Sequence, residues 1–301
     1  MNYYNEIKKE LIDNEVYKRI KDYSKNKYEL ERYYNVGKLL VEAQGGEARA
    51  KYGNGLIKEY SKRLVTEVGK KYNERTLRRI RQFYLLFKDE IWSALPTELT
   101  WSHYSELLPI QDSNIINYYI DITIKKNLSY RQLHERIKSH EYERLSDNAK
   151  EKLKTKQTIT LTDNIKHPIM IKSKYNTTDI TEKMLKNCIL ENLEDFLSEL
   201  GDGFTFIKSE YKIKFENSYN YIDILLFNYI YNCFVVIELK VTELKKEHIG
   251  QIQVYMNYID KHIKKINHDK TIGIIIAKRN NKFVMEYCSD PRIYNTTYEL
   301  I

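Results

Sequence analysis

The first half of the chain places apolar residues at the three- and four-residue spacing of amphipathic helices. This pattern predicts helices over 31–44 (ERYYNVGKLLVEAQ), 56–68 (LIKEYSKRLVTEV) and 74–87 (ERTLRRIRQFYLLF). Gly69 is expected to end the second helix and Asn73 to cap the third. Two shorter helical stretches follow, WSHYSELL and SYRQLHERIKSHEYERL. Residues 1–145 are therefore predicted to form an all-helical domain.

The pattern fades between residues 146 and 180, where SDNAKEKLKTKQTITLTDNIKHP is polar and rich in Lys and Thr. We interpret 146–180 as a linker region. Residues 181–301 then combine two expected helices, TEKMLKNCILENLEDFLSEL and KKEHIGQIQVYMNYIDKHIKKI, with five expected strands. The strand candidates are FTFIKSEYKIKF, YIDILLF, CFVVIELKV, TIGIIIA and FVMEYC. This order predicts an α/β or α+β domain with a mixed sheet flanked by helices.

The charge of the chain adds a candidate partner. The 301 residues include 50 Lys and Arg against 42 Asp and Glu, a net charge of +8, which favours a polyanion such as nucleic acid. The three Cys residues include no CxxC pair, so a thiolate zinc site is not expected. We expect a cytoplasmic protein with reduced cysteines. No signal peptide and no run of ~20 apolar residues is found, so no membrane association is expected.

Two carboxylates interrupt the most strand-like runs of the chain. If YIDILLF and CFVVIELKV pair as antiparallel strands through the Asn228–Asn232 turn, Phe227 faces Phe234 and Asp223 faces Glu238. Residues directly opposite each other lie ~5 Å apart and point to one face of the sheet. Two like charges at that separation repel, and a divalent cation between them reverses the cost. Hard oxygen ligands favour Mg²⁺, with Mn²⁺ as the alternative.

Lys240 lies two residues beyond Glu238, so strand alternation places both side chains on one face. An ammonium at that position can orient an attacking water or stabilise the charge on a phosphate. Asp223 with Glu-x-Lys on the next strand is therefore a candidate phosphodiesterase site. The alternative is an exposed strand edge with an ordinary Glu–Lys pair. The continuous apolar residues around the motif favour burial, where such charges need a partner or a function.

At these residues the sequence resembles the PD-(D/E)XK nuclease superfamily. Within it, the chain is similar to the bacterial YhcG-like family, which joins an N-terminal helical domain to a C-terminal restriction-endonuclease-like nuclease domain. The C-terminal likeness includes LENLEDFLSELGDGFTFI, YIDILLF, VVIELK and GQIQVYMNYID. The N-terminal likeness includes RAKYGNGLIKEYSKRL, ERTLRRIRQFYLLF and LTWSHYSELL. The resemblance extends over residues 33–300.

The resemblance implies a role for each matching residue. Asp223 matches the first metal carboxylate, and Glu238 and Lys240 match the E-x-K element. Glu191 matches an acidic residue that completes the metal shell, with Glu194 one helical turn away as an alternative. On the helix after the core strands, a Q-x-x-x-Y element is matched by Gln251 and Tyr255, which are counted with the catalytic set. For Glu191, Gln251 and Tyr255, a purely structural side chain is the competing interpretation.

The predicted third helix of the N-terminal half has a basic side that forms a candidate helix-turn-helix surface for a phosphate backbone. Its candidate nucleic-acid-binding residues are Lys70, Lys71, Arg75, Arg78, Arg79 and Arg81. The alternative is an ordinary solvated face on a core helix.

The expected function is a Mg²⁺-dependent endo- or exodeoxyribonuclease. The resemblance implies a cytoplasmic role in bacterial defence or DNA repair, with DNA as the partner and a homodimer or defence-system subunits as further partners. Two alternatives stay open. The first is an RNase or a structure-selective nuclease, because the catalytic set does not distinguish sugars. The second is a non-catalytic DNA-binding or assembly subunit with a nuclease-like fold.

Overall fold

The chain folds into two units, Met1–His140 and Glu141–Ile301. The computed structural model describes residues 3–17, 25–46, 54–88, 96, 98–175, 179–215 and 218–301. Each unit has a hydrophobic core of its own. None of the helices described in either unit is long and apolar enough to cross a membrane.

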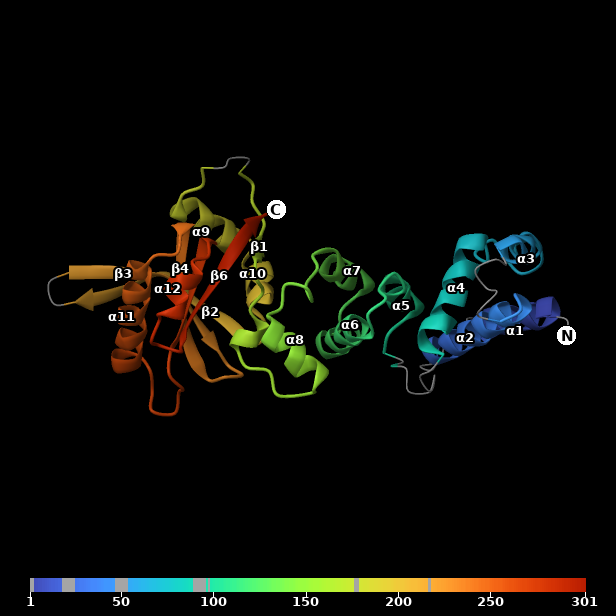
Figure 1. Ribbon diagram of the computed structural model, residues 1–301, viewed down its shortest axis with the longest axis horizontal. Coiled ribbons are helices and arrows are strands. Elements are labelled where there is room, and N and C mark those ends of the chain that lie inside the picture. The colour runs from blue at the N-terminus through green and yellow to red at the C-terminus, as the bar shows by residue number, and fades with distance from the viewer. Residues whose placement is uncertain are drawn as a thin grey trace. The chain divides into compact units, whose positions relative to one another are not determined.

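The first unit is helical throughout its described residues, as the apolar spacing predicts (Figure 1). Its helices are α1 (Tyr3–Tyr17), α2 (Lys25–Ala43), α3 (Asn54–Glu67), α4 (Glu74–Phe87), α5 (Trp101–Leu107), α6 (Ser113–Lys126) and α7 (Tyr130–Lys138). The predicted cap of α4 is confirmed, because the Asn73 side chain accepts a hydrogen bond from the backbone N–H of Thr76 at 3.1 Å. Ser129 caps α7 in the same way.

Helices α2 and α4 pack closely in this unit. A Cβ at Gly37 of α2 would lie 2.6 Å from both the carbonyl oxygen of Ile80 and the Cβ of Tyr84, so only glycine permits the approach. The core around this contact is apolar and fully covered, and helices α1 to α4 supply most of it. Its largest side chains include Tyr33 and Tyr72. Amphipathic faces with this spacing explain why the helices were readable from sequence.

The second unit is built on a six-stranded mixed sheet with the order β1-β6-β5-β4-β3-β2 (Figure 1). Its elements are α8 (Asp147–Lys154), η2 (Thr162–Asn164), β1 (Ile169–Ile171), α9 (Glu182–Glu191), α10 (Leu193–Leu200), β2 (Phe204–Phe215), β3 (Ser218–Asn228), β4 (Cys233–Glu243), α11 (Lys246–His262), β5 (Ile272–Arg279), α12 (Lys282–Glu286) and β6 (Ile293–Leu300). The pairs β2–β3 and β3–β4 are antiparallel, and the remaining pairs are parallel.

Helices cover both faces of this sheet. One core cluster joins α9 and α10 to Ile237 and Leu239 of β4, and another joins α11 to Val236 on the opposite face of the same strand. Strand β4 is consequently buried from Cys233 to Lys240. This burial on both faces accounts for its nearly continuous apolar sequence.

Three expectations about the second unit differ from the structure. FVMEYC does not form a strand: Asn281 caps the short helix α12, and the last strand is β6, which the sequence analysis did not identify. The single helix expected over TEKMLKNCILENLEDFLSEL is two helices, because Asn192 leaves the helical conformation between α9 and α10. The stretch 146–180, interpreted as a linker, contributes α8, η2 and β1 to the second unit, and β1 pairs with β6.

Candidate active site at the ends of β3 and β4

The register of β3 and β4 brings the two predicted carboxylates to one place. Phe227 pairs with Phe234 as predicted, and the ladder continues to Ile224 opposite Ile237. The next step of that register is Asp223 opposite Glu238, where the ladder ends. There the Asp223 carboxylate itself accepts a hydrogen bond from the backbone N–H of Leu239 at 3.0 Å. This contact fixes Asp223 against β4 at the point where the strands separate.

Glu238 is the most unusual group of the site, because it is a carboxylate with only 2% of its surface exposed. Its Oε1 accepts a hydrogen bond from Lys240 at 2.8 Å, whereas its Oε2 has no partner among the described residues. Burial, and then the charge of Asp223, raise the pKa of Glu238 to about 7, against the lowering effect of Lys240. A buried oxygen without a partner next to a second carboxylate is a position that a hard cation fits.

Lys186 of α9 is the second positively charged side chain of the site, and it was not predicted from the sequence. Its ammonium lies 3.1 Å from Asp223 Oδ1 and also pairs with Glu210 of β2. Burial alone would lower the pKa of Lys186, but the two carboxylates raise it overall. The signal in the sequence was its position, since Lys186 falls between Leu185 and Ile189 on the buried face of α9.

Helix α9 presents Glu182 to this cluster. Glu182 Oε1 lies 3.6 Å from Lys240 Nζ, and its charge contributes to the raised pKa of Glu238. Glu191, the residue that the family resemblance implies for the metal shell, lies nine residues further along α9, which at ~100° per residue is the opposite side of the helix. Its side chain is 47% exposed and pairs with Lys174. Glu194, its alternative, is exposed on α10.

The donor set agrees with a divalent cation only in part. Within the described ranges, no group of three or more His, Cys, Asp and Glu side chains lies close enough together to hold a metal ion. Asp223 and Glu238 supply two hard oxygen ligands, and Mg²⁺ commonly binds through one or two carboxylates with water and phosphate in its other positions. The pair therefore fits a cation that is completed by its substrate.

Helix α11 borders the same end of β4. Gln251 donates a hydrogen bond to the Tyr255 hydroxyl at 2.9 Å, so the predicted i,i+4 pair is formed. The pKa of Tyr255 is raised, mainly by burial. The hydrogen bond from Gln251 lowers this pKa, and the charge of Glu238 raises it. Burial and then the charge of Lys240 lower the pKa of His248, one turn before Gln251. The structure thus brings Gln251 and Tyr255 to the side of Glu238 and Lys240.

The predicted nucleic-acid-binding residues of the first unit lie in the α3–α4 connection and on α4. They are Lys70, Lys71, Arg75, Arg78, Arg79 and Arg81. Arg81 donates to Gln44 Oε1 at 3.2 Å, and burial followed by the charge of Arg78 lowers its pKa. Arg78 pairs with Glu74 at 2.7 Å, and Arg75 is exposed. Arg81 therefore packs within the unit, while the other side chains are half-buried or exposed.

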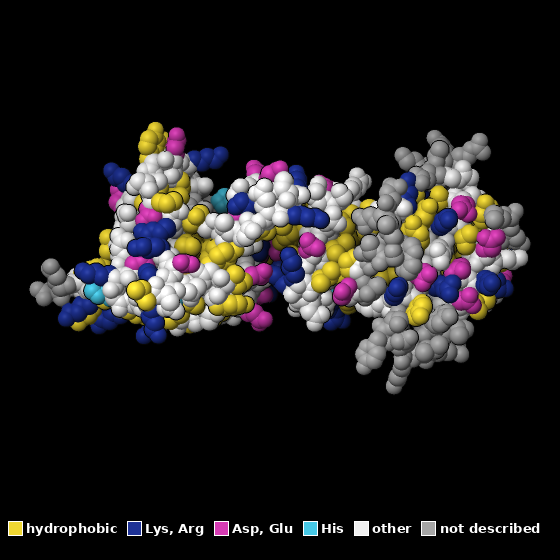
Figure 2. Space-filling view, turned by 90° about the horizontal axis from the view of Figure 1, so that it is seen from below, with side chains coloured by type: hydrophobic (Ala, Val, Ile, Leu, Met, Phe, Trp, Pro, Cys, Tyr) yellow, Lys and Arg dark blue, Asp and Glu magenta, His cyan; other side chains and the backbone are white. Residues whose placement is uncertain are grey.

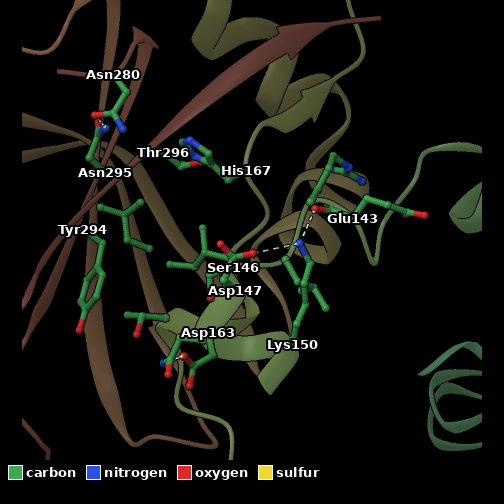
Figure 3. A pocket seen from close by; sticks show the side chains of 16 residues that line it. Glu143, Ser146, Asp147, Lys150, Asp163, His167, Asn280, Tyr294, Asn295 and Thr296 are labelled. Atoms are coloured by element: carbon green, nitrogen blue, oxygen red, sulfur yellow. Dashed lines mark hydrogen bonds and ion pairs between the residues drawn. The ribbon is translucent and has the colours of Figure 1, made fainter. Parts of the chain in front are cut away.

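A separate cavity of about 590 Å³ lies between α8, η2 and the β5–β6 part of the sheet (Figure 3). Its labelled polar groups largely pair with each other or with their neighbours. His167 and Thr296 are 2.9 Å apart, and Asp163 binds Lys152 at 2.7 Å. These contacts hold the segment before β1 against the sheet. The cavity does not include Asp223, Glu238 or Lys240. We place the candidate site at these three residues together with Glu182 and Lys186, and we call this group the carboxylate cluster.

Comparison with solved structures gives weak likenesses. One is a repair endonuclease from Pyrococcus abyssi, at 18% identity over 41% of this chain and 49% of that chain, with a TM-score of 0.29. Another is the EndoMS protein in a complex titled EndoMS-dsDNA2, at 19% identity over 43% of this chain and 48% of that chain, with a TM-score of 0.29. The chain thus spans about half the length of these solved chains.

Comparison of sequences gives a closer likeness. The YhcG protein of Escherichia coli is 27% identical over 287 residues, which cover 81% of this chain and 75% of that protein. The model of the DUF1016 N-terminal domain matches residues 9–144, and the model of the YhcG PDDEXK nuclease domain matches residues 162–299. The second match includes every residue of the carboxylate cluster. The chain therefore belongs to the family of YhcG PDDEXK nucleases that carry a DUF1016 N-terminal domain.

Proposed function

We propose that the second unit hydrolyses phosphodiester bonds of DNA with the help of a divalent cation, Mg²⁺ or Mn²⁺. The observation that supports this most directly is the buried Glu238 carboxylate, which has an oxygen without a partner and stands beside Asp223. A protein that buries two interacting carboxylates without a ligand loses stability. A cation bound by both removes that cost.

Asp223 and Glu238 would hold the cation. When bound, it would supply positive charge at the scissile phosphate and lower the pKa of a coordinated water. Asp223 is already fixed by the Leu239 N–H, so one ligand is oriented before binding. Preorganised ligands of this kind lose little conformational entropy when the cation arrives.

Lys240 would act on the phosphate or on the attacking water. Its ammonium is held at Glu238 Oε1, beside a carboxylate that would bind the cation, and is shielded from solvent. A fixed positive charge in such a place stabilises the additional negative charge that develops on phosphorus during attack. Gln251 and Tyr255 border the same end of β4 and would orient Lys240 or the substrate backbone.

The family resemblance suggests bacterial defence or DNA repair as the setting, and it suggests DNA rather than RNA as the substrate. The first unit would then hold the nucleic acid through Lys70, Lys71 and the arginines of α4, of which Arg75 is exposed and Arg78 and Arg79 are half-buried.

The test is incubation of the full-length protein with linear, circular and single-stranded DNA and with RNA, with and without Mg²⁺. Wild type should cut DNA only with the metal, and linearisation of circular DNA would assign endonuclease action. Asp223→Asn and Glu238→Gln should each abolish cleavage while the thermal unfolding transition remains cooperative. Glu299→Gln, an exposed carboxylate on β6, is the matched control and should cut normally. Full activity of either site variant would contradict the proposal.

A further inference from the structure

Strands β2 and β3 extend beyond the sheet as a two-stranded ribbon. β3 pairs with β4 only from Ile224 onward, whereas its residues 218–222 pair with β2 alone. The ribbon is the part of β2 and β3 that protrudes from the sheet at the left of Figure 1. Its described part is 211–215 paired with 218–222.

One face of this ribbon is buried. Ile213 and Ile222 are completely covered and belong to the core cluster of α11. Phe215 packs edge-on against Tyr258 of α11, with ring centroids 5.5 Å apart. The ribbon is thus held on α11 by the apolar part of this face, and its other face is exposed.

The free side combines lysine with tyrosine. Lys212 pairs with Tyr221 and Lys214 with Tyr219 in the antiparallel register, so the four side chains alternate with the buried set and share the outer face. We call these four residues the ribbon face. All four are exposed, Tyr219 by 52% and Tyr221 by 49%. The ammonium of Lys212 lies 3.7 Å from the centre of the Tyr219 ring.

The ribbon face leads directly to the candidate active site. Asp223 follows Tyr221 by two residues. Its carboxylate meets Lys186 of α9, whereas Ile222 between them packs into the core cluster of α11, so Asp223 lies on the side of the ribbon face. At ~3.4 Å per residue, Tyr221 and Tyr219 lie about 7 and 14 Å from Asp223 along the strand. Figure 2 shows Lys and Arg side chains gathered at the left end of the view, the end at which the ribbon lies in Figure 1.

We propose that the ribbon face binds the nucleic-acid strand that leads away from the scissile bond, and that this strand is unpaired there. Lys212 and Lys214 contact its phosphates, and Tyr219 and Tyr221 stack on its bases. This inference rests on the proposed nuclease function and names the form of substrate that the site takes. In the free protein Lys212 rests on the Tyr219 ring. A base that stacks on this ring releases the ammonium to a phosphate.

The tyrosines are the reason for choosing an unpaired strand. Lysines attract any nucleic acid backbone, single or double. The flat faces of bases are covered by their neighbours in a duplex, and exposed aromatic rings stack on them only where the bases are free. A face that alternates Lys with Tyr is therefore suited to a single strand, an overhang or a frayed end.

The experiment measures binding of fluorescein-labelled oligonucleotides to the full-length protein in EDTA, so that no cleavage occurs. The probes are a single strand and a blunt duplex of the same sequence. The variants are Tyr219→Thr/Tyr221→Thr, which keeps strand propensity, and Lys212→Gln/Lys214→Gln. The first control is Tyr229→Thr, an exposed tyrosine just beyond the other end of β3. The second is Lys261→Gln/Lys265→Gln, at the far end of α11 and just beyond it.

The tyrosine variant should bind the single strand at least about 25-fold more weakly, about fivefold for each ring, and the duplex within about twofold of wild type. The lysine variant should bind both probes more weakly than wild type. For the single strand, its slope of log affinity against log salt should be lower by about 1.4. Both controls should bind like wild type.

Two results would overturn the inference. The first is a tyrosine variant that binds the single strand as wild type does. The second is a tyrosine variant whose affinity for the duplex falls as much as its affinity for the single strand. Parallel assays with Mg²⁺ separate this inference from the proposed function. Wild type that binds single strands through these residues but never cuts would contradict only the nuclease proposal. If wild type cuts DNA and the tyrosine variant cuts and binds as well as wild type does, only the inference is contradicted.

Discussion

Lys186 lies with its ammonium 3.1 Å from Asp223 Oδ1, so a lysine already neutralises one of the two carboxylates that we assign to the metal. Lys186→Met should destabilise the metal-free protein by about 3 kcal/mol, because a mostly buried carboxylate loses its partner. Mg²⁺ should then stabilise the variant more than wild type, since the cation replaces the missing charge. Urea unfolding at neutral pH, in EDTA and with Mg²⁺, measures both effects.

The control for this prediction is Lys174→Met. Lys174 pairs with Glu191 at an exposed position, where solvent screening leaves such a pair little effect on stability. Lys174→Met should therefore leave both the stability in EDTA and the effect of Mg²⁺ close to those of wild type. A Lys186→Met variant that resembles this control would show that Lys186 is not the counter-charge of Asp223.

Glu238 predicts a pH dependence of stability for the metal-free protein. Its pKa rises from 4.5 to about 7 on folding, so the folded state favours the protonated carboxyl. The cost of ionising it is absent below about pH 4.5, grows as the pH rises to about 7, and is constant above. Relative to Glu238→Gln, the unfolding free energy of wild type should therefore fall by about 3 kcal/mol across this pH range. Unfolding free energies of both proteins in EDTA at several pH values measure the difference. A difference that is independent of pH would contradict the raised pKa.

The strand pair was readable from the sequence because its information is local. Phe227 and Phe234 flank a short turn, and the alternation of buried and polar positions fixes which residues face each other. The register therefore followed from the residues themselves, and with it the approach of Asp223 to Glu238. The helices predicted over 31–44, 56–68 and 74–87 were readable for the same reason, whereas α6 was not predicted.

Other parts depend on contacts between distant segments. Lys186 and Glu210 reach Asp223 from α9 and β2, and Glu182 reaches Lys240 across the sheet end. Sequence spacing on α9 does not say which of its carboxylates faces the strands. The strand β6 was missed for a related reason, since it is held by pairing with β5 on one side and, on the other, with β1, which lies more than a hundred residues earlier in the chain. Its half-polar sequence, IYNTTYEL, becomes a strand through that pairing.

Helix α9 offers a direct comparison of two carboxylates. Glu182→Gln should reduce the rise in melting temperature that Mg²⁺ causes, because Glu182 adds negative charge beside Lys240 and Glu238. Glu191→Gln should leave that rise unchanged, since Glu191 lies on the opposite side of the helix. Thermal unfolding with and without Mg²⁺ tests both, with Asp223→Asn as the variant that should respond least. The reverse order of Glu182 and Glu191 would restore the role that the family resemblance implies for Glu191.

The basic side of α4 gives a prediction for the first unit. If Arg75, Arg78 and Arg79 contact phosphates, the triple Ala variant should bind duplex DNA more weakly with little regard to sequence. The slope of log affinity against log salt should fall by about 0.9 for each lost contact. Arg78 already pairs with Glu74, so its share should be the smallest. The α4 core residues Leu77, Ile80 and Phe83 are untouched, and the fold should persist.

The measurement is duplex affinity at several salt concentrations, followed by cleavage with Mg²⁺ at low and high DNA concentration. The triple variant should cut poorly when DNA is scarce and recover when it is abundant, because the carboxylate cluster of the second unit is unchanged. A triple Ala variant of exposed basic residues on α6 and α7, Lys125, Arg131 and Lys138, controls for the loss of net charge in the same unit. It should retain most of its affinity and its salt slope. If both triple variants lose affinity equally, the effect comes from overall charge. If neither does, α4 serves protein–protein assembly, and so does the helical unit to which it belongs.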